Sequence, residues 1–232
     1  MGLQLEKEDY MNTISTVEDS LVSYYERYLY SQYSEEVILR EFDCWQGRAD
    51  LISAKIIGEF SLNFEQAKRI SNLTNAQIIS LLHYKAPRSF IYIKKRLALT
   101  EQTIKRSLKE LLNSGIIKIN NKGNILLDSN FILPKIEFNA YEAKLHNWKR
   151  ALYQATQYYG FSHYSSVIMP DKYINPALEN IEFFKGNGIG LIGVNNNGKR
   201  KVYLRPIKNQ PRRKAFYLVG LGKVMQAYLN MM

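Results

Sequence analysis

The chain has 232 residues, of which 46% are hydrophobic, enough apolar material to bury one sizeable core or two small ones. With 32 Lys and Arg against 21 Asp and Glu, its formal net charge of +11 favours a polyanionic partner such as nucleic acid, although a basic protein without such a partner can carry the same charge. A single cysteine, Cys44, excludes an intramolecular disulfide, and the 3 scattered histidines indicate no zinc-type cluster.

We expect no export or lipid-attachment signal at the N-terminus. The first residues, MGLQLEKEDY, lack the basic stretch followed by an apolar stretch that is typical of a signal peptide. Glu6 stands where N-myristoylation requires Ser or Thr. No apolar run approaches the length needed to span a bilayer. We therefore expect a cytoplasmic protein with no membrane partner.

A helix and a β-hairpin are the first predicted elements. Residues 16–33 predict a helix with Thr16 as its candidate N-cap. Its apolar face is formed by Leu21, Tyr24, Tyr25 and Tyr28. Residues 37–45 and 49–57 predict two strands, with Gly47 in the turn between them.

The predicted hairpin carries three acids, Glu41, Asp43 and Asp50. Asp50, in the sequence GRADLI just after the turn, is the preferred candidate for a functional acid. Glu41 and Asp43 compete with it for that role. The alternative is that Asp50 is a strand residue that faces solvent.

Residues 74–128 predict three helices followed by a hairpin. The first helix covers residues 74–84, with Thr74 as its N-cap and Pro87 as its breaker. The second helix covers residues 89–97, and a short turn separates it from the third.

The third predicted helix begins at Thr100 and is closed by Gly115. Its apolar side consists of Ile104, Leu108, Leu111 and Leu112. Its polar and basic side consists of Gln102, Lys105, Arg106 and Lys109. A tight hairpin follows, with the turn NNKGN at its tip, and this turn includes Lys122.

Three helices followed by a hairpin, with a basic third helix, are the arrangement of a winged helix-turn-helix, which places one helix in the major groove. We therefore predict that this part of the chain binds duplex DNA. The predicted contacts are Gln102, Lys105, Arg106, Lys109 and Lys122. The alternatives are a solvated helix face and a winged helix that contacts protein.

The segment Glu142-Ala143-Lys144 lies in a predicted strand, residues 136–145. Residues two apart in a strand face the same side, so Glu142 and Lys144 project into one space. A helix with a clear apolar face follows, and then a second strand over residues 164–169. The alternative is an exposed ion pair of little energetic value.

These residue types suit the hydrolysis of a phosphodiester. That reaction requires a nucleophilic water and neutralisation of developing charge, both of which Mg²⁺ can supply from a site with hard oxygen ligands. Asp50, Glu142 and the backbone carbonyl of Ala143 are the candidate ligands. Lys144 would orient the water or stabilise the developing charge.

Three sequence elements carry a resemblance to a known superfamily: Asp50 in GRADLI, the segment Glu142-Ala143-Lys144, and Gln154-x-x-x-Tyr158 in the following helix. They resemble the motifs of the PD-(D/E)xK nuclease superfamily, and the resemblance covers residues 16–60 and 132–200. Ala49 stands in place of the Pro that names the superfamily. The insertion of a winged helix between the first acid and Glu142 is an unusual departure.

The resemblance implies a catalytic set of Asp50, Glu142, Lys144, Gln154 and Tyr158, with Mg²⁺ as the cofactor and Mn²⁺ as the alternative metal. Gln154 and Tyr158, one helical turn apart, would hold a phosphate or the region of Lys144; otherwise they are helix surface and core. Glu18 is a further candidate metal ligand, because nucleases of this kind often place an acid on the first helix. The competing interpretation is a helix N-terminal acid favoured by the helix dipole.

The C-terminal part contains a G-x-G-x-x-G pattern formed by Gly188, Gly190 and Gly193. A dinucleotide site requires this loop to lead from a strand into a helix, whereas here it leads into a predicted β-hairpin. An amphipathic helix is predicted over residues 218–230, and the basic stretch from Lys208 to Lys214 is a candidate phosphate contact.

The predicted fold is α/β: a restriction-endonuclease-like mixed sheet flanked by helices, formed by residues 1–62 and 132–232, with an inserted α+β winged helix-turn-helix over residues 63–131. The predicted function is a metal-dependent DNA endonuclease that hydrolyses phosphodiester bonds. A non-catalytic DNA-binding regulator on the same scaffold is the alternative, and cleavage of RNA is a third, since the 17 tyrosines could stack bases. Duplex DNA and a second copy of the chain are the candidate partners.

Overall fold

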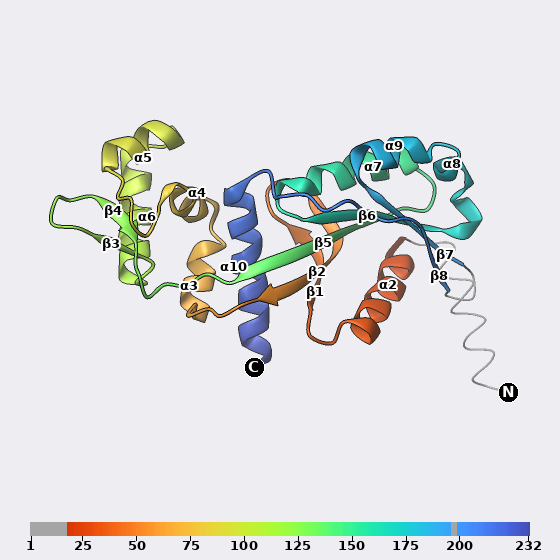
Figure 1. Ribbon diagram of the computed structural model, residues 1–232, viewed down its shortest axis with the longest axis horizontal. Helices are drawn as coiled ribbons and strands as arrows, with labels where there is room; N and C mark the ends of the chain where they lie inside the picture. The colour runs from red at the N-terminus through yellow and green to blue at the C-terminus, as the bar shows by residue number, and fades with distance from the viewer. Residues whose placement is uncertain (1–17, 196–198) are drawn as a thin grey trace. The chain divides into compact units, whose positions relative to one another are not determined.

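The computed structural model describes residues 18–195 and 199–232, so the candidate cap Thr16 lies outside the described residues (Figure 1). The chain folds into two compact units. The first unit comprises residues up to 55 together with residues 137–212, and the second comprises residues 56–136 and 213–232. The sequence predicts that the C-terminal helix belongs with the first unit, but residues 213–232 belong to the second.

The first unit is built on a mixed sheet of six strands in the order β1-β2-β5-β6-β7-β8. The strands are β1 (Val37–Asp43), β2 (Arg48–Ile57), β5 (Lys135–Ala143), β6 (Tyr164–Pro170), β7 (Gly190–Val194) and β8 (Arg200–Leu204). Strands β5, β6 and β7 run parallel, whereas β1 is antiparallel to β2 and β8 is antiparallel to β7. The predicted α/β class with a mixed sheet is therefore confirmed.

Helices cover both faces of this sheet (Figure 1). On one face lies α2 (Glu18–Gln32), which buries Leu21, Tyr25 and Leu29 against the strands and confirms the predicted apolar face. On the other face lie α7 (Trp148–Gln157), α8 (Asn175–Leu178) and α9 (Ile181–Asn187). Two short 3-10 turns, η1 (Tyr158–Gly160) and η2 (Asp171–Tyr173), follow α7 and β6.

The glycines of the G-x-G-x-x-G pattern serve chain reversal and packing. Gly188 ends α9 with a φ of 69°, in the left-handed region that favours glycine. A Cβ at Gly193 would collide with the carboxylate of Asp171 and lie 2.6 Å from the ring of Tyr203. The pattern leads into β7 and then β8, as the sequence predicts.

The second unit begins with a helix that the pattern of apolar residues does not indicate. Helix α3 (Phe64–Ile70) is stabilised by a capping box, in which Asn63 and Gln66 each accept a hydrogen bond from the other's backbone N–H. Helix α4 (Leu73–Leu81) has Asn72 as its N-cap, so the prediction of Thr74 as cap is wrong. Asn is at least as good a cap as Thr, and it accepts from the N–H of Asn75.

The rest of this unit follows the predicted order. Helix α5 (Phe90–Leu97) is capped by Ser89, and α6 (Glu101–Asn113) is capped by Thr100. The strands β3 (Ile117–Ile119) and β4 (Ile125–Leu127) form the hairpin, and a bridge joins Arg88 to Ile125. On α6 the predicted apolar side is wrong at Leu112, which is 42% exposed, whereas Ser107 is buried.

Helix α10 (Lys214–Met231) packs against α3 and α4 and completes the second unit. Its buried residues are Leu218, Val219, Gly220, Leu221, Gly222, Val224 and Met225. These positions run around the helix, so the prediction of a simple amphipathic helix over residues 218–230 is wrong. None of the helices in the described part of the chain combines the length and the apolar character that a membrane crossing needs.

Candidate functional site

The adjacent strands β2 and β5 bring two carboxyl groups to one face of the sheet. Leu51 and Ala143 belong to the core under α2, and side chains alternate along a strand, so their neighbours Asp50 and Glu142 face the opposite side. Asp50 Oδ2 accepts a hydrogen bond of 2.8 Å from the backbone N–H of Ala143. This bond fixes Asp50 beside the end of β5.

Glu142 is fully buried, which is unusual for a carboxyl group. Its Oε2 atom accepts a short hydrogen bond from the hydroxyl of Tyr158, which also contacts the carbonyl of Arg48 at 3.0 Å. Its Oε1 atom forms an ion pair of 3.1 Å with Nζ of Lys144. One carboxylate oxygen therefore faces the hydroxyl of Tyr158, and the other faces the ammonium of Lys144.

The ammonium of Lys144 lies among the oxygens that the sequence predicts as metal ligands. Nζ is 3.0 Å from Oε2 of Glu18 and 3.0 Å from the carbonyl of Ala143. Glu142 supplies the third oxygen at 3.1 Å. The structure thus gathers Glu18, Ala143 and Glu142 around one positive charge, and that charge marks where a cation is stabilised.

Burial and mutual repulsion raise the pKa values of two acids in this cluster. Burial, followed by the charge of Asp50, raises the pKa of Glu142 to about 7, although Tyr158 and Lys144 oppose the shift. Burial also raises the pKa of Asp50. Burial lowers the pKa of Lys144, but Glu142 and Glu18 outweigh it, so the net pKa lies above the usual value. Two acids that resist ionisation side by side favour an additional cation.

The oxygens present fit a hard divalent cation such as Mg²⁺ or Mn²⁺. Carboxylate and carbonyl oxygens are the ligands that these ions prefer. Asp50, Glu142 and the carbonyl of Ala143 would hold the ion, and Glu18 would join them on release from Lys144. Across residues 18–195 and 199–232, no three His, Cys, Asp or Glu side chains form a ligand group by themselves. The backbone carbonyl and water would therefore have to complete the coordination.

Gln154 and Tyr158 behave differently from each other. Tyr158 lies in η1, just after α7, and its hydroxyl reaches Glu142. Gln154 is half-buried, and its Oε1 atom is buried without a hydrogen-bond partner among the described residues. The structure therefore joins Tyr158 to the acids and records no bond between Gln154 and them.

The competing acids lie outside the cluster. Glu41 has a φ of 50° and forms an ion pair of 2.7 Å with Arg48 at the surface. Asp43 accepts a hydrogen bond of 2.7 Å from the backbone N–H of Trp45 and so shapes the β1–β2 turn. A hydrogen bond joins the carboxylate of Asp50 to the Glu142-Ala143-Lys144 segment, whereas Glu41 acts on Asp50 through its charge, which adds to the rise in the pKa of Asp50.

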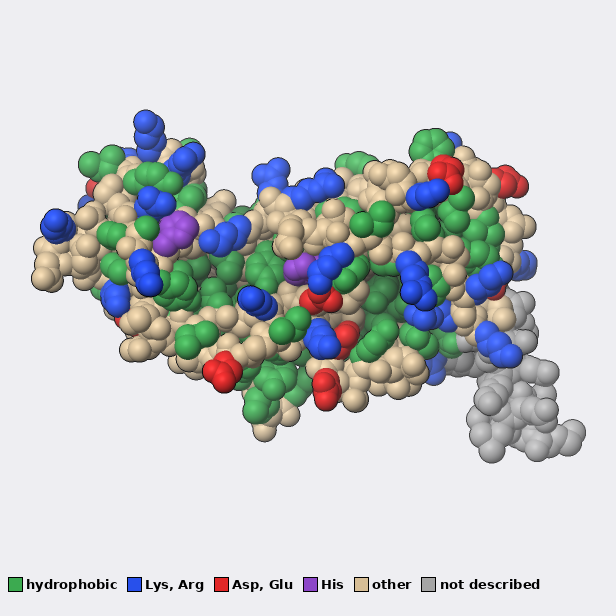
Figure 2. Space-filling view, in the orientation of Figure 1, with side chains coloured by type: hydrophobic (Ala, Val, Ile, Leu, Met, Phe, Trp, Pro, Cys, Tyr) green, Lys and Arg blue, Asp and Glu red, His purple; other side chains and the backbone are tan. Residues whose placement is uncertain are grey.

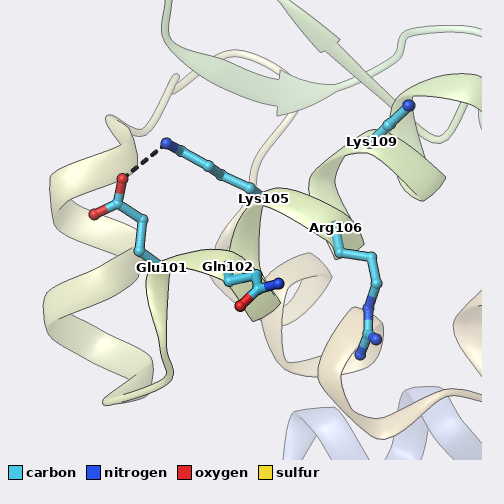
Figure 3. A pocket seen from close by; sticks show the side chains of 5 residues that line it. All are labelled: Glu101, Gln102, Lys105, Arg106 and Lys109. Carbon is cyan, nitrogen blue, oxygen red and sulfur yellow. Dashed lines mark ion pairs between the residues drawn. The ribbon is translucent and has the colours of Figure 1, made fainter.

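In the second unit, residues of α6 line an open pocket (Figure 3). They are Glu101, Gln102, Lys105, Arg106 and Lys109. Figure 3 shows Lys105 turned toward Glu101, at 2.8 Å, while Arg106 and Lys109 extend away from that pair. Glu101 also pairs with Lys94 at 3.1 Å. The charge of Lys105 is thus partly neutralised, whereas no ion pair within the described residues involves Arg106 or Lys109.

Two further features of this unit escape the sequence interpretation. Helix α5 ends in Lys94, Lys95 and Arg96, so it adds basic groups beside α6. The guanidinium of Arg88 lies 4.9 Å from the ring centre of Tyr92. The run of basic residues at the end of α5 is the sequence feature that indicates a second basic helix in this unit. Lys122 is exposed in the β3–β4 turn, as the sequence predicts.

Comparisons with known proteins yield no match: no protein-family model, no curated protein and no solved structure matches the chain. Function is therefore inferred from the geometry of this chain alone.

Proposed function

We propose that this protein is a metal-dependent DNA endonuclease of the PD-(D/E)xK type, with a winged-helix unit that binds DNA. The observation that carries the proposal is the buried carboxyl of Glu142 beside Asp50, with Lys144 two residues further on the same strand face. Acids with raised pKa values and a fixed ammonium within reach are typical of functional sites.

The arrangement of the first unit supports this proposal. The order α2, β1, β2, β5, α7, β6 places the candidate acids on adjacent central strands and a helix after the Lys-bearing strand, as in nucleases of this type. The inserted elements lie between β2 and β5 in sequence, yet the two strands remain neighbours in the sheet. The insertion is therefore compatible with an intact site.

In the proposed reaction, a bound Mg²⁺ or Mn²⁺ would lower the pKa of a water molecule and neutralise charge on the phosphate. Asp50, Glu142 and the carbonyl of Ala143 would hold the cation. Lys144 directs its ammonium at the charge that develops on the phosphate oxygens. Tyr158 donates a hydrogen bond from its hydroxyl to Glu142 and so fixes the orientation of that carboxylate.

The second unit supports a DNA-binding role. Its helices α4, α5 and α6 precede the β3–β4 hairpin, and a single β-bridge joins Arg88 to Ile125 of that hairpin; this order is typical of winged helices. Helix α6 exposes Arg106 and Lys109 to solvent. An exposed basic helix of this kind fits a phosphate-lined groove.

Nicking of supercoiled plasmid, followed over time with Mg²⁺ and with EDTA, tests the proposal. We expect Mg²⁺-dependent nicking by wild type and a loss of about a hundredfold or more in rate for Glu142→Gln and Lys144→Ala. Binding of DNA in EDTA should change little, because Glu142 acts by holding the ion, which EDTA removes, and Lys144 acts on charge that forms during the reaction. Glu182→Gln, at an exposed acid on α9, is the matched control and should cut normally.

Two outcomes would reject the proposal. Wild type that binds DNA but cleaves neither DNA nor RNA with Mg²⁺ or Mn²⁺ would identify a non-catalytic DNA-binding regulator. Normal cutting by both site variants would place the catalytic groups elsewhere.

A further inference from the structure

A cationic segment, residues 199–212, follows the last parallel strand of the first unit and contains no acid. Its basic residues are Lys199, Arg200, Lys201, Arg205, Lys208 and Arg212. It belongs to a longer stretch, residues 183–232, with ten Lys and Arg and no Asp or Glu. Nearly all of the net charge of +11 therefore originates in the last fifth of the chain.

The charges of the cationic segment are available for binding. Its basic side chains are exposed, except for the half-buried Arg200. Among the described residues, the ion pairs of this segment are limited to that of Lys208 with Glu137. Figure 2 likewise shows many more Lys and Arg than Asp and Glu side chains on the face that it presents. A structural role in salt bridges therefore does not account for the segment.

Aromatic rings lie under four of these six cations. The cation-to-ring-centre distances are 4.4 Å for Arg200 over Tyr28, 4.4 Å for Lys201 over Tyr203, 5.6 Å for Lys208 over Tyr164 and 5.5 Å for Arg212 over Tyr159. Such contacts hold long basic side chains in place at the surface. The rings themselves are buried or half-buried, so they hold the cations in place, and the cations are the groups that would meet phosphate.

The register of the sheet relates this segment to the carboxylate cluster. Ala143 pairs with Ile168, Ile168 with Ile192, and Ile192 with Val202. Because β8 runs antiparallel to β7, Lys201 precedes Val202 at the same end of the sheet at which Lys144 follows Ala143. Three strand spacings separate them, or about 14 Å, which corresponds to about four nucleotides along one strand of a duplex.

We propose that the start of β8 and the cationic segment bind the phosphodiester backbone of nucleic acid and align it with the carboxylate cluster. The inference deepens the proposed nuclease function and rests on it for the identity of the reaction. The binding step itself needs only phosphate charge, so it is measurable without cleavage. This contact surface is separate from the one on α6.

The exposed lysines at the start of β8 have a simpler explanation, because β8 is an edge strand. Strand β8 is the last strand of the sheet, and charged side chains on such strands prevent edge-to-edge association. If the lysines only protect the edge, their removal should change neither the affinity of the protein for nucleic acid nor the salt dependence of that binding. Titration with DNA and measurement of oligomeric state therefore separate the two explanations.

The test compares two double variants of the full chain. Lys199→Ala with Lys201→Ala removes two charges from the proposed surface. Lys55→Ala with Lys185→Ala removes two exposed lysines of the same unit from β2 and α9, away from that end of the sheet. Fluorescence anisotropy with a 30-base-pair duplex and with one of its strands, in EDTA at several salt concentrations, gives affinity and salt slope.

We expect the β8 variant to bind about tenfold or more weakly, with a salt slope reduced by about two. The control should retain the slope of wild type. A loss confined to the duplex or to the single strand would show which form of the backbone the surface holds. Because EDTA prevents cleavage, these results stand whether or not wild type proves to be a nuclease.

An unchanged slope for the β8 variant on both probes overturns the proposal. Self-association of that variant in analytical ultracentrifugation would then assign the lysines to edge protection. Equal losses for both double variants would also overturn it, because net charge alone would explain the effect. Phosphatidylserine vesicles serve as a further probe. If the β8 variant lost binding to these vesicles but not to DNA, the surface would be assigned to a membrane instead.

Discussion

Glu142 combines properties that a purely structural residue would not need. Its carboxyl is fully buried, one oxygen is bonded to Tyr158, and the other faces the ammonium of Lys144. Replacing a buried ionic group with an apolar side chain is often neutral or stabilising, so the fold does not require an acid here. A role in binding a cation, as proposed above, would account for the cost of burying this acid.

The raised pKa of Glu142 predicts a loss of stability as pH rises in metal-free buffer. Burial, followed by the charge of Asp50, moves this pKa from 4.5 to about 7. Between these values the folded state binds more protons than the unfolded state, so the free energy of unfolding falls as pH increases. The expected contribution is about 3 kcal/mol over the window. Urea unfolding in EDTA at about pH 5 and about pH 8 measures it.

Glu142→Gln should remove most of this pH dependence and be more stable than wild type at about pH 8, because the charge of Glu142 is then no longer buried. Glu41→Gln is the control, since the carboxylate of Glu41 is exposed and pairs with Arg48. Equal pH dependence in wild type and Glu142→Gln would show that Glu142 does not titrate in this window.

At this scale, strand alternation predicts which side chains face together but not which atoms meet. The spacing of Glu142 and Lys144 places both on one face, and the structure agrees. The link from Lys144 to Glu18 joins residues 126 positions apart and depends on how α2 crosses the sheet. The contrast between Tyr158 and Gln154 depends on where α7 ends, which helical periodicity cannot determine.

Helix α6 shows that a basic helix face need not be uniformly available to a ligand. The ammonium groups of Lys105 and Lys94 lower the pKa of Glu101, so this acid remains charged and retains both partners. Arg106 and Lys109 are one turn apart or less and lie further along the helix. The two residues can contact adjacent phosphates together.

We expect Arg106→Ala with Lys109→Ala to reduce the salt slope of DNA binding by about two, one unit for each phosphate contact. Lys105→Ala should reduce it by less than one, because Glu101 already neutralises that charge. Glu101→Gln should tighten binding by releasing Lys105 and Lys94. Anisotropy titrations of a duplex at several salt concentrations measure all three variants.

Lys68→Ala, at an exposed position of α3, is the control for loss of charge in the same unit. Equal slopes for the Arg106–Lys109 variant and this control would make α6 a protein-contact or structural helix. Weaker binding by Glu101→Gln would contradict the proposed neutralisation.

Local signals predict most elements, because caps and turns act over a few residues. Ser89 and Thr100 cap α5 and α6 as their chemistry suggests, and the β3–β4 hairpin forms around its Asn- and Gly-rich turn. The wrong N-cap of α4 arises because two candidates stand close together. Asn72 and Thr74 are both good caps, and the choice between them depends on packing beyond the helix.

At the level of the whole molecule, the prediction differs from the structure in the unit to which the C-terminal helix belongs. Helix α10 leaves the sheet-bearing unit and packs on α3 and α4, about 150 residues earlier in the sequence. Neither composition nor periodicity specifies such a distant partner. Gly222 allows α10 to pack closely on α3. A Cβ added there would lie 2.7 Å from the carbonyl of Ala67 and 2.6 Å from the backbone nitrogen of Ser71.

Gly222→Ala should therefore destabilise the second unit. Within a helix, Ala is normally better than Gly by roughly 1 kcal/mol, but the added methyl would meet backbone atoms of α3 that cannot rotate away. We expect a net loss of about 1–3 kcal/mol, typical of overpacking. Hydrogen exchange should show faster exchange in α3, α4 and α10, with β5 and β6 still protected.

Gly186→Ala, in α9, is the matched control, because a Cβ there meets nothing within 4 Å. Only the propensity gain remains at that position, so this variant should be as stable as wild type or more so. If Gly222→Ala instead loosened β5 and β6 along with α3, the two units would unfold as one. If Gly222→Ala proved as stable as Gly186→Ala, α10 would not pack on α3 as closely as the structure has it, and its assignment to the second unit would lose its main support.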